Sequence, residues 1–320
     1  MTTVAITSPL PGRAEEFLSE RFAVRIHDGP ALLTEEAVAE FFGAADGAVA
    51  VLANPITRRV FESCPSLRVV GNVAVGFDNI DIPAAEERGI WITNTPDVLT
   101  EATADLAWAL VLAVTRRLRE MEDYVRSGSF RGWGLDLLLG KGLQGKTMGI
   151  VGYGRIGRAV ARRALASGMT VAYTDLEPHH EPDPEAEFFK LEELLSISEV
   201  VSLHAPLTEN TRHLIDEERL LRMPTGAVLV NTARGPLVDE EALVKVLEAG
   251  HLGGAGLDVF EHEPHVHPSL LHRNDVVLLP HVGSATVETR AAMAELAAHN
   301  VAAVLEGDEP PTPVVRGLSS

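Results

Sequence analysis

The stretch Met148-Gly-Ile-Val-Gly-Tyr-Gly-Arg-Ile-Gly157 decides the fold of this chain. Gly152, Gly154 and Gly157 form a G-x-G-x-x-G pattern directly after a short apolar run. Where such a pattern joins a strand to a helix, its glycines allow a tight turn, close approach of the backbone to a pyrophosphate, and close packing of the helix on the strand. The free N–H groups and partial positive charge at the start of the helix then favour phosphate binding.

An acidic residue farther along indicates which dinucleotide binds. Asp175 ends the next apolar run, 18 residues after Gly157. A carboxylate there accepts hydrogen bonds from the ribose hydroxyls of NAD and repels the 2′-phosphate of NADP, and Tyr173–Glu177 contains no Lys or Arg. We predict a dinucleotide site that prefers NADH over NADPH, with a purely structural glycine turn as the alternative. Arg155 and Ile156 are expected at this site, although Arg155 either contacts a phosphate or is merely exposed.

The composition indicates a soluble globular protein. Of its 320 residues, 46% are hydrophobic, and the mean hydropathy of +0.09 fits a substantial core. The formal net charge of −19 argues against nucleic acid as a partner, because phosphate binding needs a basic surface. An anionic substrate would then need a local cation, so we expect an arginine in the site.

The sequence also predicts a cytoplasmic protein without membrane or metal. Cys64 is the single cysteine, so no intrachain disulfide forms, and we interpret it as a small buried residue rather than a nucleophile. The N-terminus does not resemble a signal peptide, and no apolar run approaches the ~20 residues that span a bilayer. Four histidines crowd one segment without the fixed spacing of metal ligands, so a loop is favoured there over a metal site; they are His262, His265, His267 and His272.

Strand-like and helix-like segments alternate in the rhythm of βαβ units, which predicts an α/β fold. Short runs of Val, Ile, Leu and Ala are typical of parallel strands covered on both faces. They predict strands at Thr3–Thr7, Ala48–Leu52, Val69–Asn72, Trp91–Thr93, Thr147–Val151, Thr170–Tyr173, Val200–Leu203, Ala227–Asn231, Gly256–Val259 and Val276–Leu279. Helices are predicted at Glu35–Phe42, Ile82–Arg88, Thr100–Leu118, Ile156–Ala166, Leu191–Leu195, Asp216–Leu221, Glu240–Ala249 and 286–306.

The position of the glycine pattern predicts two domains. It begins near residue 147, so the α/β segments before it must form another domain. We predict two doubly wound parallel-sheet domains. A Rossmann-type NAD-binding domain, residues 99–286, is inserted into a flavodoxin-like substrate domain, residues 1–98 plus 287–320. Thr100–Leu118 is apolar on most faces and is expected to be a long buried helix, whereas the acidic, Pro-rich Glu177–Glu187 is expected to be a solvated loop.

Three polar groups follow three successive predicted strands. Arg234 lies in Asn231-Thr-Ala-Arg-Gly, Glu263 in Leu257-Asp-Val-Phe-Glu-His-Glu-Pro, and His281 in Pro280-His-Val-Gly-Ser. Ligands of open α/β sheets bind outside the carboxyl ends of the strands, so we expect these groups at one edge.

This set of side chains suits hydride transfer to a 2-oxo acid. The forked guanidinium of Arg234 can hold a carboxylate and its neighbouring carbonyl. His281 can protonate the developing alkoxide near neutral pH, and Glu263 beside it would orient the ring and stabilise its charged form. Taken singly, the three residues have structural or surface interpretations; together they predict a catalytic site.

The same motifs give the chain a resemblance to the D-isomer-specific 2-hydroxyacid dehydrogenase family over essentially its whole length. Residues 72–81, Asn-Val-Ala-Val-Gly-Phe-Asp-Asn-Ile-Asp, resemble the family's substrate-carboxylate loop, and 95–107 resemble its entry into a long interdomain helix. The resemblance implies substrate binding by backbone N–H groups near Val75 and Gly76 and by Arg234 and His281. It implies catalysis by Arg234, Glu263 and His281, the last as acid/base. The cofactor contacts that it implies are Thr103, His204, Pro206, Thr232, Ala233, Asp258, Gly283 and Ser284.

Within the family the chain is most similar to glyoxylate/hydroxypyruvate reductases. Trp133 lies in Arg-Gly-Trp-Gly, where that subgroup places a tryptophan that reaches the partner subunit, although its usual following proline is absent. Phosphite dehydrogenases carry lysine at the position of Val75, and the absence of that lysine here argues against phosphite as the substrate. We therefore expect a homodimer that reduces a small 2-oxo acid in an interdomain cleft. Another D-2-hydroxyacid dehydrogenase (D-3-phosphoglycerate, D-lactate or phosphite type) and an NADH-sensing regulator on the same fold are the alternatives.

Overall fold

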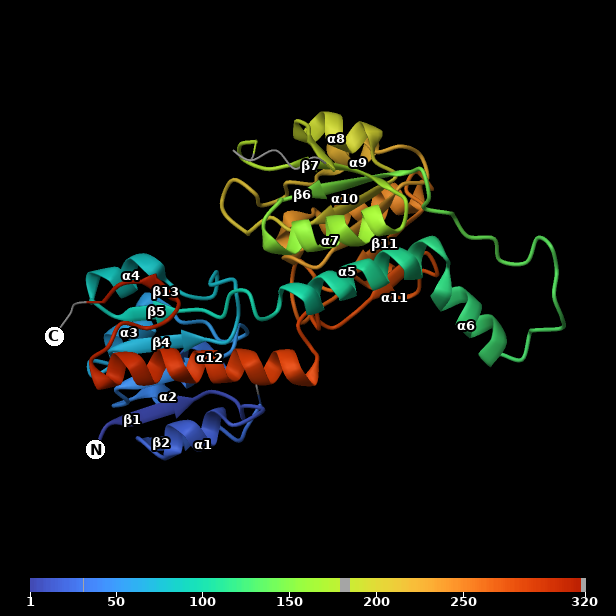
Figure 1. Cartoon of the computed structure of the whole chain (residues 1–320). Coiled ribbons are helices and arrows are strands. Elements are labelled where there is room, and N and C mark those ends of the chain that lie inside the picture. The colour runs from blue at the N-terminus through green and yellow to red at the C-terminus, as the bar shows by residue number, and fades with distance from the viewer. Residues whose placement is uncertain (31, 179–184, 318–320) are drawn as a thin grey trace. The chain divides into compact units, whose positions relative to one another are not determined.

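The short apolar runs of the sequence form parallel strands in two sheets (Figure 1). The computed structural model describes residues 1–30, 32–178 and 185–317. The chain divides into one unit formed by Met1–Leu99 and Ser284–Ser320, and a second formed by Thr100–Gly283. The predicted α/β class with two doubly wound sheets is confirmed.

The first unit contains a six-stranded sheet in the order β13-β5-β4-β3-β1-β2. Its strands are parallel except for β13, which runs antiparallel to β5. The order of the first five strands is that of flavodoxin-like folds. The strands are β1 (Thr3–Ile6), β2 (Ala23–Ile26), β3 (Gly47–Ala50), β4 (Val69–Asn72), β5 (Trp91–Thr93) and β13 (Pro313–Val315).

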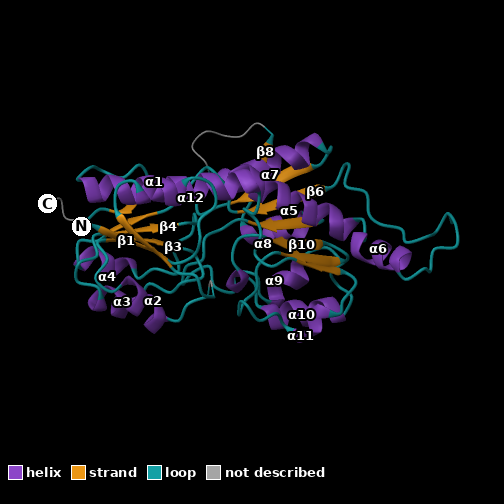
Figure 2. Cartoon of the chain, turned by 90° about the horizontal axis from the view of Figure 1, so that it is seen from below, coloured by secondary structure: helices purple, strands orange, loops and turns teal. Residues whose placement is uncertain are grey.

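Helices cover both faces of this first sheet, as Figure 2 shows. One face carries α1 (Ala14–Ser19) and the long α12 (Val287–Glu306), which packs on β3 and β4. The other face carries α2 (Glu35–Phe42), α3 (Arg58–Ser63) and α4 (Ile82–Glu87).

The second unit contains a fully parallel, seven-stranded sheet in the order β12-β11-β10-β9-β6-β7-β8. The chain leaves β6 toward β7 on one side and later returns to β9 on the other, which is the topological switch point where such sheets bind ligands. The strands are β6 (Thr147–Val151), β7 (Thr170–Thr174), β8 (Ala186–Phe188), β9 (Val200–Leu203), β10 (Val228–Asn231), β11 (Gly254–Leu257) and β12 (Val276–Leu278).

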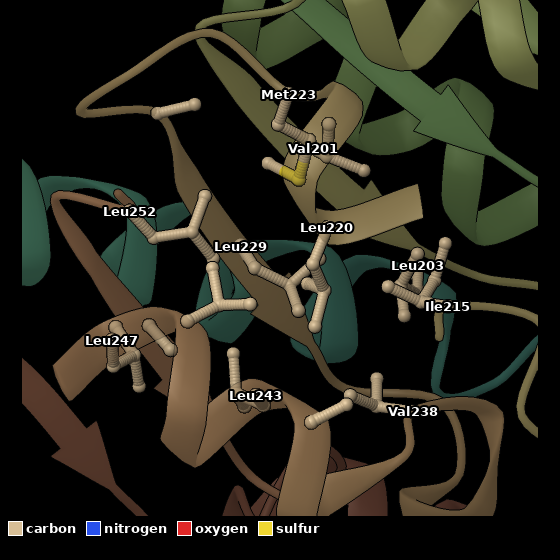
Figure 3. Close-up of a cluster of buried hydrophobic side chains, with 14 of the residues drawn as sticks. Val201, Leu203, Ile215, Leu220, Met223, Leu229, Val238, Leu243, Leu247 and Leu252 are labelled. Atoms are coloured by element: carbon tan, nitrogen blue, oxygen red, sulfur yellow. The ribbon is translucent and has the colours of Figure 1, made fainter. Parts of the chain in front are cut away.

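Two layers of helices enclose the second sheet. Its helices are α5 (Thr100–Thr115), α6 (Leu118–Arg126), α7 (Arg155–Ala166), α8 (Leu191–Ile197), α9 (Glu217–Arg222), the 3-10 helix η1 (Gly235–Leu237), α10 (Glu240–Glu248) and α11 (Pro268–Leu271). Between the strands and α9–α10 lies a cluster that includes Val201, Leu229, Leu220, Leu243 and Leu247 (Figure 3). Truncating one of these leucines to alanine should lower the free energy of unfolding by about 2–5 kcal/mol, so this cluster stabilises the second unit.

The long helix predicted at Thr100–Leu118 is shorter than expected. It ends at Thr115, whose carbonyl accepts a hydrogen bond from the N–H of Lys141, 2.8 Å away. Arg117 then adopts a left-handed φ of 56°, and α6 starts at Leu118, which is exposed rather than buried.

Other differences concern the strands. The expected solvated loop Glu177–Glu187 lies partly outside the described residues, and its last two positions belong to β8. Strand β11 starts and ends two residues earlier than predicted, and its end at Leu257 coincides with a bend of the chain at Asp258. Within the described ranges, no helix has the length and apolar character needed to cross a membrane.

Candidate active site

The glycine pattern forms the turn between β6 and α7. Gly152 has a φ of 90°, and a Cβ there would lie 2.6 Å from the backbone N of Ala205. A Cβ on Gly157 would lie 2.2 Å from the carbonyl oxygen of Gly152, so glycine allows the helix to pack against the turn. Around Gly154, by contrast, no atom of the described residues other than Gly154 and its two chain neighbours lies within 4 Å of the Cβ position. The turn therefore leaves open space beside the first residues of α7.

Asp175 follows β7 and faces this turn. Its Oδ2 accepts a hydrogen bond from the N–H of Tyr153 at 2.9 Å, and its Oδ1 accepts one from Leu176 at 2.8 Å. The carboxylate is thus held beside the glycine turn by backbone N–H groups. Arg155 is exposed and Ile156 is half-buried at the start of α7.

Two more of the predicted cofactor residues, His204 and Thr232, follow other strands of the same sheet. His204 follows β9, and burial lowers its pKa to about 4, so its ring is neutral near pH 7. Its Nε2 lies 2.9 Å from Ser202 Oγ. Thr232 follows β10, and its buried Oγ1 has no hydrogen-bond partner among the described residues. An unpartnered buried hydroxyl is costly, so this edge suits a ligand that offers a polar group to Thr232.

The other predicted cofactor positions lie in several elements. Thr103 is buried in α5, and its methyl lies 3.4 Å from the Cβ position of Gly283. Pro206 is exposed and Ala233 is half-buried, and Ser284 belongs to the first unit.

Arg234 lies in a loop that Asn231 fixes. The Oδ1 of Asn231 accepts the N–H of Ala233 at 3.0 Å, and its Nδ2 donates to the carbonyl of Arg234 at 2.8 Å. A Cβ on Gly235 would lie 1.8 Å from the carbonyl oxygen of Phe260, so only glycine fits where the two loops meet. The arginine's Nη1 donates to the Ala233 carbonyl at 2.8 Å.

His281 and Glu263 form a hydrogen-bonded pair. Their strands β12 and β11 are neighbours, and β10 lies next to β11. Nδ1 of His281 lies 2.9 Å from Oε2 of Glu263, while Oε1 accepts the N–H of Phe260 at 3.1 Å. Burial raises the pKa of Glu263, but the hydrogen bond and charge of His281, with smaller contributions from Phe260 and Arg234, hold it below its ordinary value.

Asp258 fixes the loop that carries His281. Its carboxylate oxygens accept the N–H groups of Val282 and Gly283, both at 2.7 Å, and its carbonyl accepts the N–H of His281 at 2.8 Å. Burial raises the pKa of Asp258 against the opposing effect of these bonds. His281 itself has a left-handed φ of 54°, which non-glycine residues rarely adopt. The hydrogen bonds to Asp258 therefore maintain an unfavourable backbone conformation.

The predicted substrate loop lies in the first unit. The carbonyl of Val75 accepts a hydrogen bond from Asn94 Nδ2, and that of Gly76 accepts one from Asn72 Nδ2, each at 2.8 Å. With both carbonyls bound, the loop can present its N–H groups to an anion. The motifs did not assign a role to either asparagine; an Asn at or just after the end of a buried strand was the available signal.

The chain's relatives identify the family. Residues 108–283 match the family described as D-isomer specific 2-hydroxyacid dehydrogenase, NAD binding domain. A glyoxylate reductase from Thermococcus onnurineus is 47% identical over 319 residues, 98% of this chain and 96% of that protein. The chain belongs to the D-isomer specific 2-hydroxyacid dehydrogenase family. It is an NAD-dependent dehydrogenase.

Solved structures agree with the fold of this dehydrogenase. A protein from Thermus thermophilus is 48% identical with a TM-score of 0.93, covering 98% of this chain and all of that one. An NADPH-dependent glyoxylate/hydroxypyruvate reductase from Sinorhizobium meliloti, in complex with NADP and malonate, is 34% identical with a TM-score of 0.87; the coverage is 100% of this chain and 99% of that one. An NADPH-dependent enzyme therefore shares this fold.

The histidine-rich segment of the dehydrogenase forms local contacts. His262 and His265 are joined by a β-bridge. His267 is the N-cap residue of α11, and its Nε2 lies 3.1 Å from Oε2 of Glu241. Among the described residues no group of three or more His, Cys, Asp or Glu side chains is arranged to hold a metal ion.

Proposed function

We propose that this dehydrogenase uses NADH to reduce a small 2-oxo acid, glyoxylate or hydroxypyruvate, to the corresponding D-2-hydroxy acid. The observation that carries the proposal is the 2.9 Å contact between His281 Nδ1 and Glu263 Oε2, at the ends of two adjacent strands. A third strand beside them ends in the loop of Arg234. Glyoxylate reductases among the relatives support the choice of substrate.

His281 is the proposed proton donor. Its Nδ1 faces Glu263, so Nε2 is the nitrogen left to protonate the substrate's carbonyl oxygen. Glu263 stabilises the charged ring before the proton leaves and fixes its orientation. Bound NADH would supply the hydride to the carbonyl carbon. After transfer, the imidazole is neutral and the hydroxyl carries the proton.

Arg234 and the loop of Val75 and Gly76 are the proposed anion-binding groups. The guanidinium supplies forked, charge-assisted hydrogen bonds to the carboxylate and carbonyl. Because Asn94 and Asn72 bind the loop carbonyls, the N–H groups of Val75 and Gly76 keep a fixed direction for the carboxylate. These contacts favour small 2-oxo acids.

The second unit is the proposed NADH domain, and the first is the proposed substrate domain. Gly154 and the start of α7 would hold the pyrophosphate, Asp175 the adenine ribose, and Thr232 a polar group of the cofactor. We propose NADH over NADPH because Asp175 would repel a 2′-phosphate and Leu176 beside it carries no charge.

We also propose a homodimer through an arm of the second unit. Figure 1 shows α6 and the loop after it extending away from their sheet. The arm exposes large apolar side chains, among them Val125, Phe130, Trp133 and Leu135, the last two 83% and 80% exposed. A group of exposed apolar side chains of this kind indicates a binding surface.

A cytoplasmic location stays a prediction of the sequence.

A steady-state screen of 2-oxo acids tests the proposed function. Glyoxylate and hydroxypyruvate should give the highest kcat/KM with NADH, phenylpyruvate should be poor, and phosphite with NAD should not react usefully. Hydroxypyruvate should yield D-glycerate alone. A preference for phenylpyruvate, or efficient phosphite oxidation, would overturn the substrate assignment.

A further inference from the structure

We infer that Glu261 is a positioning residue that fixes the loop of Glu263 against the segment that follows Arg234. The inference rests on the proposed function, since it assigns Glu261 a role in aligning that site. Glu261 lies two residues before Glu263, and its side chain is 10% exposed. No motif of the sequence indicates a role for Glu261.

The carboxylate of Glu261 connects three segments. Oε1 lies 2.6 Å from Nε2 of His213, and Oε2 accepts the N–H of Glu240, the first residue of α10, at 3.2 Å. The N–H of Glu261 in turn donates to Oε1 of Glu240 at 3.3 Å. The loop is therefore tied to the start of α10 by two reciprocal bonds.

His213 extends the connection to the loop of Arg234. Its own N–H donates to the carbonyl of Pro236 at 2.8 Å, within η1, which begins directly after Arg234. Gly235 of η1 packs its Cα against the carbonyl of Phe260. Glu261 thus closes a ring of contacts that includes the segments next to both proposed catalytic groups, Arg234 and Glu263.

The charges around Glu261 make this ring costly to break. Burial raises the pKa of Glu261, but the hydrogen bond and charge of His213, the Glu240 N–H and the charge of His262 hold it below its ordinary value. Arg212 adds an ion pair at 3.6 Å. Burial raises the pKa of Glu240 beside this charge, against the opposing effect of the hydrogen bond from the Glu261 N–H. Removing the Glu261 carboxylate leaves the N–H of Glu240 without this partner.

Glu261 touches none of the proposed reacting groups, so it should act through Glu263 and Arg234. Misplacing a reacting group by 1 Å can cost about 100-fold in rate. We expect Glu261→Ala to lower kcat about 10–100-fold, and Glu261→Gln, which keeps one acceptor, to lower it less. The loss of activity at alkaline pH should also begin at lower pH, because a misplaced Glu263 stabilises the protonated His281 ring less well.

The matched control is Glu241→Gln. Glu241 is the next residue of α10, and its carboxylate forms a similar contact with His267 at 3.1 Å, but it does not contact Phe260–Glu263. All variants are compared for NADH affinity and thermal midpoint as well as for pH–rate profile. His213→Asn provides a second route to the same break, and asparagine tolerates the left-handed φ of 50° at this position.

A double-mutant cycle with Glu263→Gln tests the mechanism. Glu261→Ala should cost clearly less in the Glu263→Gln background than in the unsubstituted protein, and Glu241→Gln should change nothing in either. If turnover depends on His281 but folded Glu261 and His213 variants match Glu241→Gln, or if the effects of Glu261 and Glu263 are additive, the inference is wrong and the proposed function stands. If the unsubstituted protein shows no His281-dependent turnover, the proposed function fails and the inference fails with it.

Discussion

His281 and Glu263 are joined by a 2.9 Å contact between Nδ1 and Oε2, although they follow two different strands. The contact depends on a backbone that His281 would not adopt alone, with a φ of 54°. Asp258 supports this conformation by accepting hydrogen bonds from the N–H groups of Val282 and Gly283, which follow His281. The pairing therefore arises because β11 and β12 are parallel neighbours, so that the loops that follow them leave the sheet at the same edge.

Glu263→Gln should change the pH dependence of reduction. The amide cannot stabilise a protonated imidazole as the carboxylate does, so the alkaline fall in kcat should move to lower pH. Because the pKa of Glu263 lies below its ordinary value of 4.5, the carboxylate stabilises the fold above that pH, and this contribution is lost as the pH falls through the lower, folded value. The stability difference between Glu263→Gln and the unsubstituted protein should thus shrink in acid. If the fall of kcat at alkaline pH were unchanged in Glu263→Gln, Glu263 would have no role in the mechanism.

Two glycines of one turn should respond in opposite ways. Gly157→Ala forces a methyl to within 2.2 Å of backbone, so it should destabilise the fold by about 1–3 kcal/mol or more. The methyl of Gly154→Ala would have no described residue within 4 Å apart from its two chain neighbours, so this variant should keep the thermal midpoint. It should nevertheless weaken NADH binding about tenfold, or ~1.4 kcal/mol, because the methyl occupies space meant for the pyrophosphate. Full NADH affinity in Gly154→Ala would place the cofactor elsewhere.

Cofactor choice should depend on the charge of Asp175. Asp175→Asn keeps an oxygen to accept the Tyr153 N–H, and Leu176→Arg places a cation at a residue that is 94% exposed. The double variant should raise the ratio of kcat/KM for NADPH to that for NADH, and Leu176→Arg alone should raise it less. A preference for NADPH in the unsubstituted protein would refute the assignment.

Arg234→Lys should preserve the charge but lose the fork. Charge-assisted hydrogen bonds contribute about 1.5–3 kcal/mol, so kcat/KM for glyoxylate should fall about tenfold or more. Arg222→Lys, in an exposed ion pair with Glu218, is the control and should be neutral. Equal kinetics for the two variants would mean that Arg234 does not bind the substrate through its fork.

The sequence predicted the buried parts of the fold better than its edges. The bounds of β4, β6 and β9 agree with their apolar runs, because strands covered on both faces are continuously hydrophobic. Strands β2 and β8 lie at sheet edges, where residues such as Arg25 and Glu187 interrupt the pattern. The antiparallel β13 also escaped prediction, since its pairing with β5 connects segments more than 200 residues apart.

The candidate site was predictable where a motif concentrated its chemistry. The Gly152 turn, Arg234, Glu263 and His281 all lie in short, recognisable stretches. The supporting contacts could not be predicted in this way. Glu261 contacts His213, which lies 48 residues away in the sequence, and nothing in that spacing indicates a contact. The end of the long helix at Thr115 could not be predicted either, because the carbonyl of Thr115 is bound by the N–H of Lys141, a residue of a later loop.

The most direct test of the central claim is the oxidation of NADH by glyoxylate, compared between the unsubstituted protein and His281→Asn. Asparagine tolerates the left-handed backbone at this position but cannot donate the proton. Turnover by the unsubstituted protein should exceed that of His281→Asn by about 10²–10⁴-fold, with similar NADH affinity in both. Equal rates, or no glyoxylate-dependent oxidation in either protein, would contradict the account.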